Sequence, residues 1–282
     1  MIITKRAVFI ILLWILSAAG ISQEITDLKF AEYLYNTGQF YDAITEYKRV
    51  LFFNNGHKLK ADIFYKIGIC YKNGGFPDNS LFYITKAIEN ETDNRLRNTY
   101  QFEFAKIMMK KGDYTTAKME LEDLMDRKLP SSMADSVNYF LGWSEISMLN
   151  WLSAENYFKN IKKSSYNTSQ LFKSCIEGKK LKYKSAVKAI LLSTFIPGAG
   201  QIYAGELLDG IIAFVLNAGI IYYLTDSILD KRYTDTALIY YFLFGRFYPA
   251  NRANAYKYAV QYNIDLNKNF LKKIKNAAGF QF

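Results

Sequence analysis

The sequence predicts an all-α protein, in which a solenoid of helical hairpins is followed by a small hydrophobic helical domain that attaches to a membrane. Three observations lead to this prediction. Small and large apolar residues recur with a period of 37 residues through residues 23–168. Within each period, apolar residues are spaced by three and four, as on one face of an amphipathic helix. Beyond residue 185, long uncharged stretches replace the repeat.

The repeat has small residues at two positions of each period, where the two helices of a hairpin cross closely, and large apolar residues on either side. We expect four units, at about residues 24–60, 61–97, 98–134 and 135–168. The small positions hold Ala31, Gly68, Ala105 and Gly142, and then Ala43, Ser80, Ala117 and Ala154. The large positions hold Phe40, Pro77, Tyr114 and Trp151; Phe30, Ile67, Phe104 and Leu141; Tyr47, Ile84, Leu121 and Phe158; and Val50, Ala87, Leu124 and Ile161.

Each unit fits two amphipathic helices separated by a short break, such as residues 37–39 in the first unit and 111–113 in the third. Residues 38–43 and 112–117 each place Gly at the turn, an aromatic residue at the start of the second helix and Ala three residues later. These stretches resemble the tetratricopeptide repeat, whose usual period is about 34 residues. The period here is longer, the turn of the second unit carries Pro77, and the fourth unit has no turn glycine.

In tetratricopeptide-repeat proteins the first helix of each unit lines a concave groove, so the resemblance implies a groove that binds a protein partner. Here it would be aromatic and lightly charged, and it would include Leu28 and Glu32. Any of its aromatic residues could instead be solenoid core. Trp143 is the best candidate for an anchor, because Trp is favoured at binding hot spots and Gly142 already supplies the close-packing position. The candidate groove residues are Tyr35, Tyr65, Ile69, Lys72, Phe102, Lys106, Met109, Tyr139, Trp143 and Ile146.

Residues 1–22 have the order of a secretory signal. Lys5 and Arg6 precede an apolar run at residues 7–16, and small residues follow as far as Ser22. An apolar run this short suits a signal better than a membrane span. We expect cleavage after Ser22, with an uncleaved anchor as the alternative. The signal places the repeats outside the inner membrane of a bacterial cell envelope, in the periplasm.

The C-terminal part has three expected regions. Their apolar stretches are short: a helix of 16 residues is about 24 Å long, against a hydrocarbon core of roughly 30 Å. These stretches could therefore span a membrane with some adjustment or lie partly in its interface, and the number of crossings stays open. The regions are a capping helix and basic linker at 169–185, a hydrophobic helical membrane domain at 186–260 and a basic tail at 261–282.

A sequence motif follows the basic linker. Residues 193–205, followed by Asp209-Gly210, Asn217 and residues 247–251, resemble a small bacterial membrane domain of unassigned biochemical role that is often attached to tetratricopeptide repeats. Where that domain tends to have Gly, this chain has Ala250. The motif residues are Pro197, Gly198, Gly200, Gln201, Tyr203, Gly205, Asp209, Gly210, Asn217, Asn251 and Arg252.

The polar members of this motif lie among apolar residues. We expect them to face inward and pair, since unpaired polar groups within a membrane are costly. A structural lock is the simpler interpretation, and a polar path or ligand site between the helices is the alternative. The polar members are Gln201, Asp209, Asn217, Asn251 and Arg252.

The positive charge belongs to the C-terminal part. Residues 169–282 carry 15 Lys and Arg against 7 Asp and Glu, a net charge of +8, whereas residues 23–168 are neutral. The basic run from Lys179 to Lys188 directly precedes the apolar domain, so we expect it to contact anionic lipid headgroups. A solvated capping helix is the alternative, and the secretory signal argues against a nucleic-acid partner.

The residues needed for catalysis or metal binding are scarce. With one histidine, His57, and two separated cysteines, Cys70 and Cys175, the chain offers neither a zinc site of the usual kind nor a Ser-His-Asp constellation. Because solenoid repeats touch only their neighbours, we expect two separate buried thiols and no disulfide. The sequence therefore predicts a non-enzymatic protein without a cofactor or metal.

These observations favour a membrane-attached adaptor or scaffold of a bacterial envelope, in which the repeat groove binds a protein partner. Two alternatives stay open. The first is an accessory factor for membrane-protein insertion or export, in which the apolar helices act on a client protein. The second is a small transporter or channel component.

Overall fold

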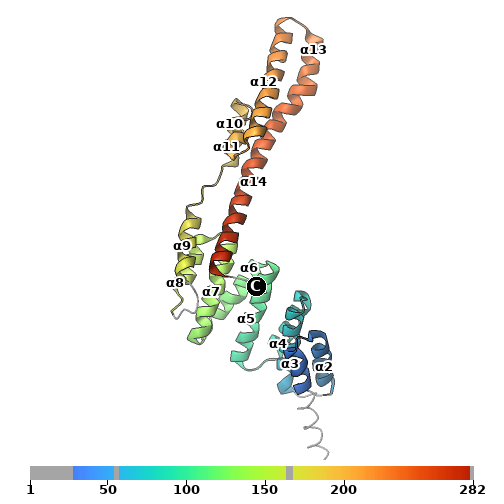
Figure 1. Ribbon diagram of the computed structural model, residues 1–282, viewed down its shortest axis with the longest axis vertical. Coiled ribbons are helices and arrows are strands. Elements are labelled where there is room, and N and C mark those ends of the chain that lie inside the picture. Colours follow the sequence, from blue (N-terminus) through green and yellow to red (C-terminus); the bar gives the residue numbers. More distant parts are fainter. Residues whose placement is uncertain (1–27, 54–56, 163–167, 280–282) are drawn as a thin grey trace, which may run out of the picture. The chain divides into compact units, whose positions relative to one another are not determined.

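The computed structural model describes residues 28–53, 57–162 and 168–279, and each element within them is a helix (Figure 1). The predicted all-α class is confirmed for these residues. The chain divides into two compact units, the first extending to Thr168 and the second beginning at Ser169. The expected signal and its cleavage after Ser22 lie outside the described residues.

The first unit is a series of helical hairpins. Along the series from α2 to α8, each helix packs against the next one in the sequence. The second helices of the hairpins begin at one column of the 37-residue period, which is the column of Phe40. The helices are residues 28–36, α2 (Phe40–Phe53), α3 (His57–Asn73), α4 (Pro77–Asn90), α5 (Asn94–Lys111), α6 (Tyr114–Met125), α7 (Ser131–Ser147) and α8 (Trp151–Lys159).

The two small columns of the repeat lie where helices approach closely. A Cβ added to Gly142 would lie 2.4 Å from the ring of Phe158, and one added to Gly68 would lie 2.5 Å from the side chain of Ile84. Only very small residues fit at such crossings. One large position departs from its column, because Phe30 is 48% exposed. The members of the second small column, all fully buried, are Ala43, Ser80, Ala117 and Ala154.

The turn between the two helices of each hairpin uses the left-handed backbone region. Gly38, Gly75 and Gly112 have φ of 80°, 86° and 87°. In the fourth hairpin the same register is occupied by Leu149, with φ of 65°. Glycine adopts this conformation without steric penalty, whereas the Cβ of Leu149 strains the backbone.

Replacing Leu149 with Gly is expected to raise the free energy of unfolding of the first unit by about 1 kcal/mol, because it removes this strain. Urea unfolding followed by tryptophan fluorescence measures the effect, since Trp143 and Trp151 lie on either side of the turn. The reciprocal change, Gly112→Leu, should lower stability by a similar amount. Equal or lower stability of Leu149→Gly would contradict the assignment of strain.

The second unit contains a long helical hairpin, in which α12 lies beside the segment formed by α13 and η1 (Figure 1). Residues 196–198, which include the Pro-Gly pair of the motif, separate α10 from α11. The basic tail is the end of the long helix α14. The helices are α9 (Thr168–Lys179), α10 (Ala186–Phe195), α11 (Ala199–Ala204), α12 (Leu207–Leu229), α13 (Tyr233–Leu238), the π-helix η1 (Ile239–Phe244) and α14 (Gly245–Ala278).

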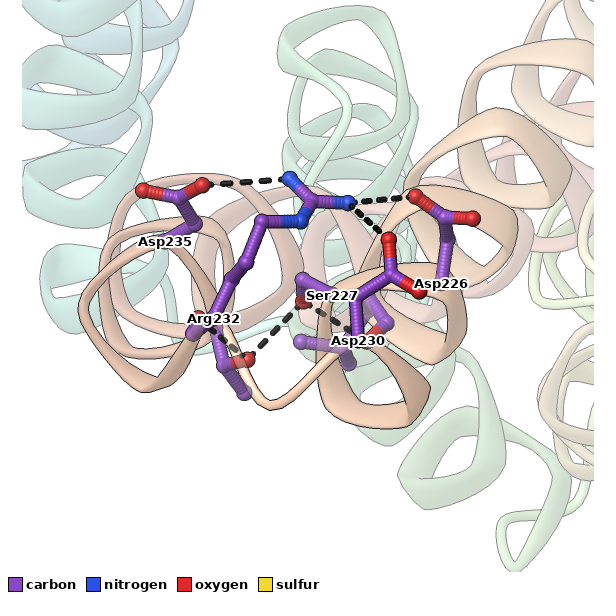
Figure 2. A network of polar contacts seen from close by, with 7 residues as sticks. Asp226, Ser227, Asp230, Arg232 and Asp235 are labelled. Atoms are coloured by element: carbon purple, nitrogen blue, oxygen red, sulfur yellow. Dashed lines mark hydrogen bonds and ion pairs between the residues drawn. The ribbon is translucent and has the colours of Figure 1, made fainter.

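The turn between α12 and α13 is charged. Figure 2 shows the Arg232 guanidinium among the carboxylates of Asp226, Asp230 and Asp235. Beneath this cluster, the hydroxyl of Ser227 on α12 lies 2.9 Å from a hydroxyl on α13. The end of the hairpin is therefore polar, whereas the sides of α12 carry many exposed apolar side chains.

Candidate functional site

The first unit contains a pocket, which we call the N-terminal pocket, between the helix at residues 28–36, α2 and α3. Its volume is about 320 Å³. Three of the predicted groove residues, Tyr35, Tyr65 and Ile69, line it. It is thus the part of the expected groove that forms a defined cavity. The full lining is Glu32, Tyr35, Asn36, Tyr47, Tyr65, Lys66 and Ile69.

Tyr47 comes from the second helix of its hairpin, and its side chain lines the pocket while only 1% of the residue is exposed. Its hydroxyl makes no hydrogen bond to any residue that the structure describes. Burial, followed by nearby groups that include Glu32 and Asp62, raises the pKa of Tyr47 above its ordinary value, so the hydroxyl stays protonated. Because this side chain lines the pocket, a ligand that fills the pocket displaces water from the hydroxyl, and a polar group of the ligand can replace the lost hydrogen bond.

Charged groups stand at one side of the pocket. The ammonium of Lys66 lies 2.6 Å from a carboxylate oxygen of Glu32 and 3.1 Å from one of Asp62. Burial lowers the pKa of Lys66, but hydrogen bonding to the two carboxylates outweighs burial and raises it overall. Two carboxylates share one ammonium, so these three side chains together carry a charge of −1.

Two further predicted groove residues, Lys72 on α3 and Lys106 on α5, form an ion-pair cluster with Glu103. Glu103 accepts hydrogen bonds from Lys72, at 3.0 Å, and from Lys106. Burial raises the pKa of Glu103, and the two lysines more than offset this, so that its pKa lies below the ordinary value. Lys106 also lies over the ring of Phe102, 5.0 Å from its centroid. These lysines are therefore already occupied within the unit.

The remaining predicted groove residues are buried in the structure. Met109, Tyr139, Trp143 and Ile146 are all buried, and Trp143 is 0% exposed. Trp143 packs beside Tyr139, with ring centroids 6.4 Å apart. Its indole offers no surface to a partner, so the expectation of Trp143 as an anchor gives way to its alternative, a core residue.

The C-terminal motif forms a hydrogen-bonded network within the second unit. The Asn251 side chain donates to the carbonyl of Ser193 at 2.9 Å, and its oxygen accepts from the backbone N–H of Gly198, also at 2.9 Å. The Gln201 amide donates to the Asn251 side-chain oxygen at 2.9 Å, and the Ser193 hydroxyl donates to Gln201 at 2.8 Å. The network joins α14 to the turn between α10 and α11. The inward pairing expected for Gln201 and Asn251 is present.

Two motif glycines allow the backbone of this turn to touch α12. A Cβ added to Gly198 would lie 2.0 Å from the carbonyl oxygen of Gly210, and the φ of Gly198 is 87°. A Cβ added to Gly210 would lie 2.8 Å from the carbonyl oxygen of Gly198. Close packing therefore accounts for these glycines.

The other polar motif residues behave differently. Asp209 accepts a hydrogen bond from the Tyr258 hydroxyl at 2.6 Å. Asn217 is buried but donates to Ala213 of its own helix. Arg252 was expected to face inward and pair, but its side chain is exposed and contacts no other described polar group. It differs from its neighbour Asn251 because adjacent helical residues point about 100° apart.

A cavity of about 290 Å³ separates α12 from α14 beside this network. Phe247, Ile212 and Leu216 give it an apolar part. Its polar lining comes from both helices and from α11. The polar residues are Gln201, Asp209, Asn217, Asn251, Asn254 and Tyr258.

Near this network, the residues just before α10 form hydrogen bonds with α14 and with Tyr203. The side chain of Asn263 on α14 exchanges two 2.8 Å hydrogen bonds with the backbone of Lys184, just before α10. The hydroxyl of Tyr203 accepts from the backbone N–H of Ser185 at 3.1 Å. The ammonium groups of Lys184 and Lys188 lie 4.7 and 5.1 Å from the ring centroid of Tyr203. Lysines and tyrosines thus gather at the start of the apolar helices.

Cys70 and Cys175 form no disulfide, and both are buried, one in each unit. Burial raises the pKa of the Cys70 thiol to about 12, so it is protonated at neutral pH and unreactive. Among the described residues there is no group of three or more His, Cys, Asp or Glu side chains that could hold a metal ion.

No protein-family model matches the sequence, and no curated protein matches it. Among solved structures, the chain is similar to a tetratricopeptide repeat protein from Parabacteroides merdae, with 16% identity and a TM-score of 0.49 over 90% of this chain and 99% of that chain. It is also similar to the C-terminal part of a TPR repeat-containing protein from Cytophaga hutchinsonii, with 15% identity and a TM-score of 0.42 over 83% of this chain and 94% of that chain.

Sequence reasoning missed Tyr47, Asn36 and Lys66 as pocket residues. Tyr47 was placed in a core column, where the other units carry Ile84, Leu121 and Phe158, all apolar. A hydroxyl in a column that is otherwise apolar is the signal that could have found it. Asn36 and Lys66 carry no such signal, since polar residues are common on exposed helix faces.

Proposed function

We propose that the protein is a membrane-attached adaptor whose first unit binds a protein partner and whose second unit holds it at a bilayer. The observation that carries the binding half is the N-terminal pocket, whose lining includes Tyr47, a residue whose hydroxyl makes no hydrogen bond to any described residue. The expected secretory signal supports a place in the bacterial envelope, with the repeats in the periplasm.

The membrane half of the proposal is supported by α12. This helix has 23 residues, and its most apolar stretch of 18 residues has a mean hydropathy of 1.9, with only 17% of that stretch buried. Its length of about 34 Å is enough to cross a hydrocarbon core of roughly 30 Å. Apolar side chains that the protein leaves uncovered are stabilised by lipid. Lys184, Lys188 and Tyr203 at the start of the apolar helices suit the headgroup region, where the run from Lys179 to Lys188 would contact anionic lipid.

Alkaline carbonate extraction tests this attachment. The full chain is expected to stay in the membrane pellet, because apolar helices resist removal, whereas a protein adsorbed through lysines is released when they lose their charge. Asn217→Leu keeps a similar bulk and removes one polar group from the cavity, so it should remain in the pellet as well. Release of the wild-type chain into the supernatant would contradict membrane attachment.

Proximity labelling from the first unit in living cells tests the adaptor. An adaptor predicts a small and fixed set of labelled neighbours, which Tyr65→Ala should deplete while the unit stays folded. A broad set of newly made membrane proteins would instead support the insertion or export factor. If Tyr65→Ala leaves the labelling pattern unchanged, the pocket does not take part in binding the partner.

A further inference from the structure

The N-terminal pocket contains the chemistry of a cation site. Its walls include the side chains of three tyrosines, Tyr35, Tyr47 and Tyr65. An aromatic ring has a negative face, which attracts ammonium and guanidinium groups at distances up to about 6 Å. The Tyr65 ring is held in place by stacking on Tyr100, with centroids 4.4 Å apart. A fixed ring loses little freedom when a ligand binds.

The charged groups beside the pocket also favour a cationic ligand. Among the described side chains, Glu32 and Asp62 form ion pairs with Lys66 alone, which leaves this group with one negative charge. An acidic side chain entering the pocket would be repelled by this charge. An apolar side chain would leave the Tyr47 hydroxyl without a hydrogen bond, at a cost in affinity. A basic side chain meets the ring faces, the excess carboxylate and a hydroxyl oxygen that can accept its hydrogen bond.

We propose that the N-terminal pocket binds a lysine or arginine side chain of the partner protein. This inference rests on the proposed adaptor function and names the chemistry of its contact. The pocket volume of about 320 Å³ lies at the lower end of the range for small-ligand sites, which suits one long side chain. Glu32 supplies the attraction through its share of the excess charge, and Tyr47 supplies the hydrogen bond that orients the cation.

Small probes test this on the full chain in detergent micelles. N-acetyl-lysine amide and N-acetyl-arginine amide are titrated against chain carrying ¹³C-labelled tyrosine, beside the neutral N-acetyl-norleucine amide and the acidic N-acetyl-glutamate amide. Both basic probes are expected to shift the ring resonances of Tyr47 and Tyr65. Norleucine and glutamate probes should bind at least about tenfold more weakly, because they lack the charge-assisted hydrogen bond.

Two variants assign the roles. Glu32→Gln removes the excess charge and should weaken binding of the arginine probe about tenfold, and Tyr47→Phe should weaken it about fivefold. Glu89→Gln makes the same chemical change at an exposed position of α4 and should bind like the wild type. Thermal melting followed by tryptophan fluorescence identifies any variant that no longer folds. If Glu32→Gln does not fold, Tyr47→Phe alone tests the site, since it keeps the aromatic ring and removes only the hydroxyl.

Equal binding of the norleucine probe, preference for the glutamate probe, or no shift of either tyrosine would overturn the cation site. In each of these cases the proximity-labelling result stands independently. If the wild-type chain labels a small set of neighbours that depends on Tyr65, the protein is still an adaptor, but its contact with the partner has a different chemistry. If the wild-type chain labels no such set, the adaptor function is contradicted as well.

Discussion

Replacing Asn251 with Leu is expected to lower the free energy of unfolding of the second unit by about 4 kcal/mol. The side chain of Asn251 satisfies the Gly198 N–H, the Ser193 carbonyl and the Gln201 amide, all within a buried network. Leu has a similar bulk but offers none of these hydrogen bonds. Each buried polar group left without a partner costs about 1–3 kcal/mol, and part of that is recovered by relaxation.

Far-UV circular dichroism of the full chain in detergent micelles, with increasing denaturant, measures this loss. Asn254→Leu is the matched control, because Asn254 is exposed on the same helix and should change stability by less than about 0.5 kcal/mol. Tryptophan fluorescence should be unaffected, since all three tryptophans of the sequence, Trp14, Trp143 and Trp151, precede Ser169, where the second unit begins. Similar stability of both asparagine variants would show that the network is not a structural lock.

Replacing Gly198 with Ala is expected to destabilise the second unit by about 3 kcal/mol. The new Cβ would lie 2.0 Å from the carbonyl oxygen of Gly210, so the turn and α12 must separate. A backbone oxygen cannot move aside as a flexible side chain does. The left-handed conformation at Gly198 adds a further penalty for any residue with a Cβ.

Gly205→Ala separates these two contributions. Gly205 has φ of 106°, and a Cβ there would meet no described atom within 4 Å, so this variant carries only the conformational penalty of about 1 kcal/mol. The same denaturation experiment compares the two. If Gly198→Ala is no worse than Gly205→Ala, the close approach of the turn to α12 is not a determinant of stability.

The repeat was predictable because its signals are local and recur. A glycine at Gly38, Gly75 and Gly112 marks a turn by its conformational freedom, and the residue two positions later starts the next helix in every hairpin. The fourth hairpin keeps the turn with Leu149, because the contacts of α7 with α8 impose the geometry on a residue that does not favour it. Local preference is a weak force beside packing.

The candidate site was predictable only in part. Register placed Tyr35 and Tyr65 on the first helices of adjacent hairpins, and they line one pocket. Register places Trp143 on an equivalent helix face, yet Trp143 is buried, so register alone could not tell a pocket residue from a core residue. The difference depends on which neighbouring side chains cover each position, and a repeat pattern does not contain that information.

The sequence by itself determined the helical class, the 37-residue period and the starts of the second helices, because these depend on residues close together in the chain. Only the tertiary structure decided that Tyr47 lines a pocket and that Asn251 forms a hydrogen bond with Gly198, which lies 53 residues away in the sequence. Helical periodicity says which residues share a face. The partner of a face is decided by how helices far apart in the sequence pack, since burial and hydrogen bonding are satisfied between them.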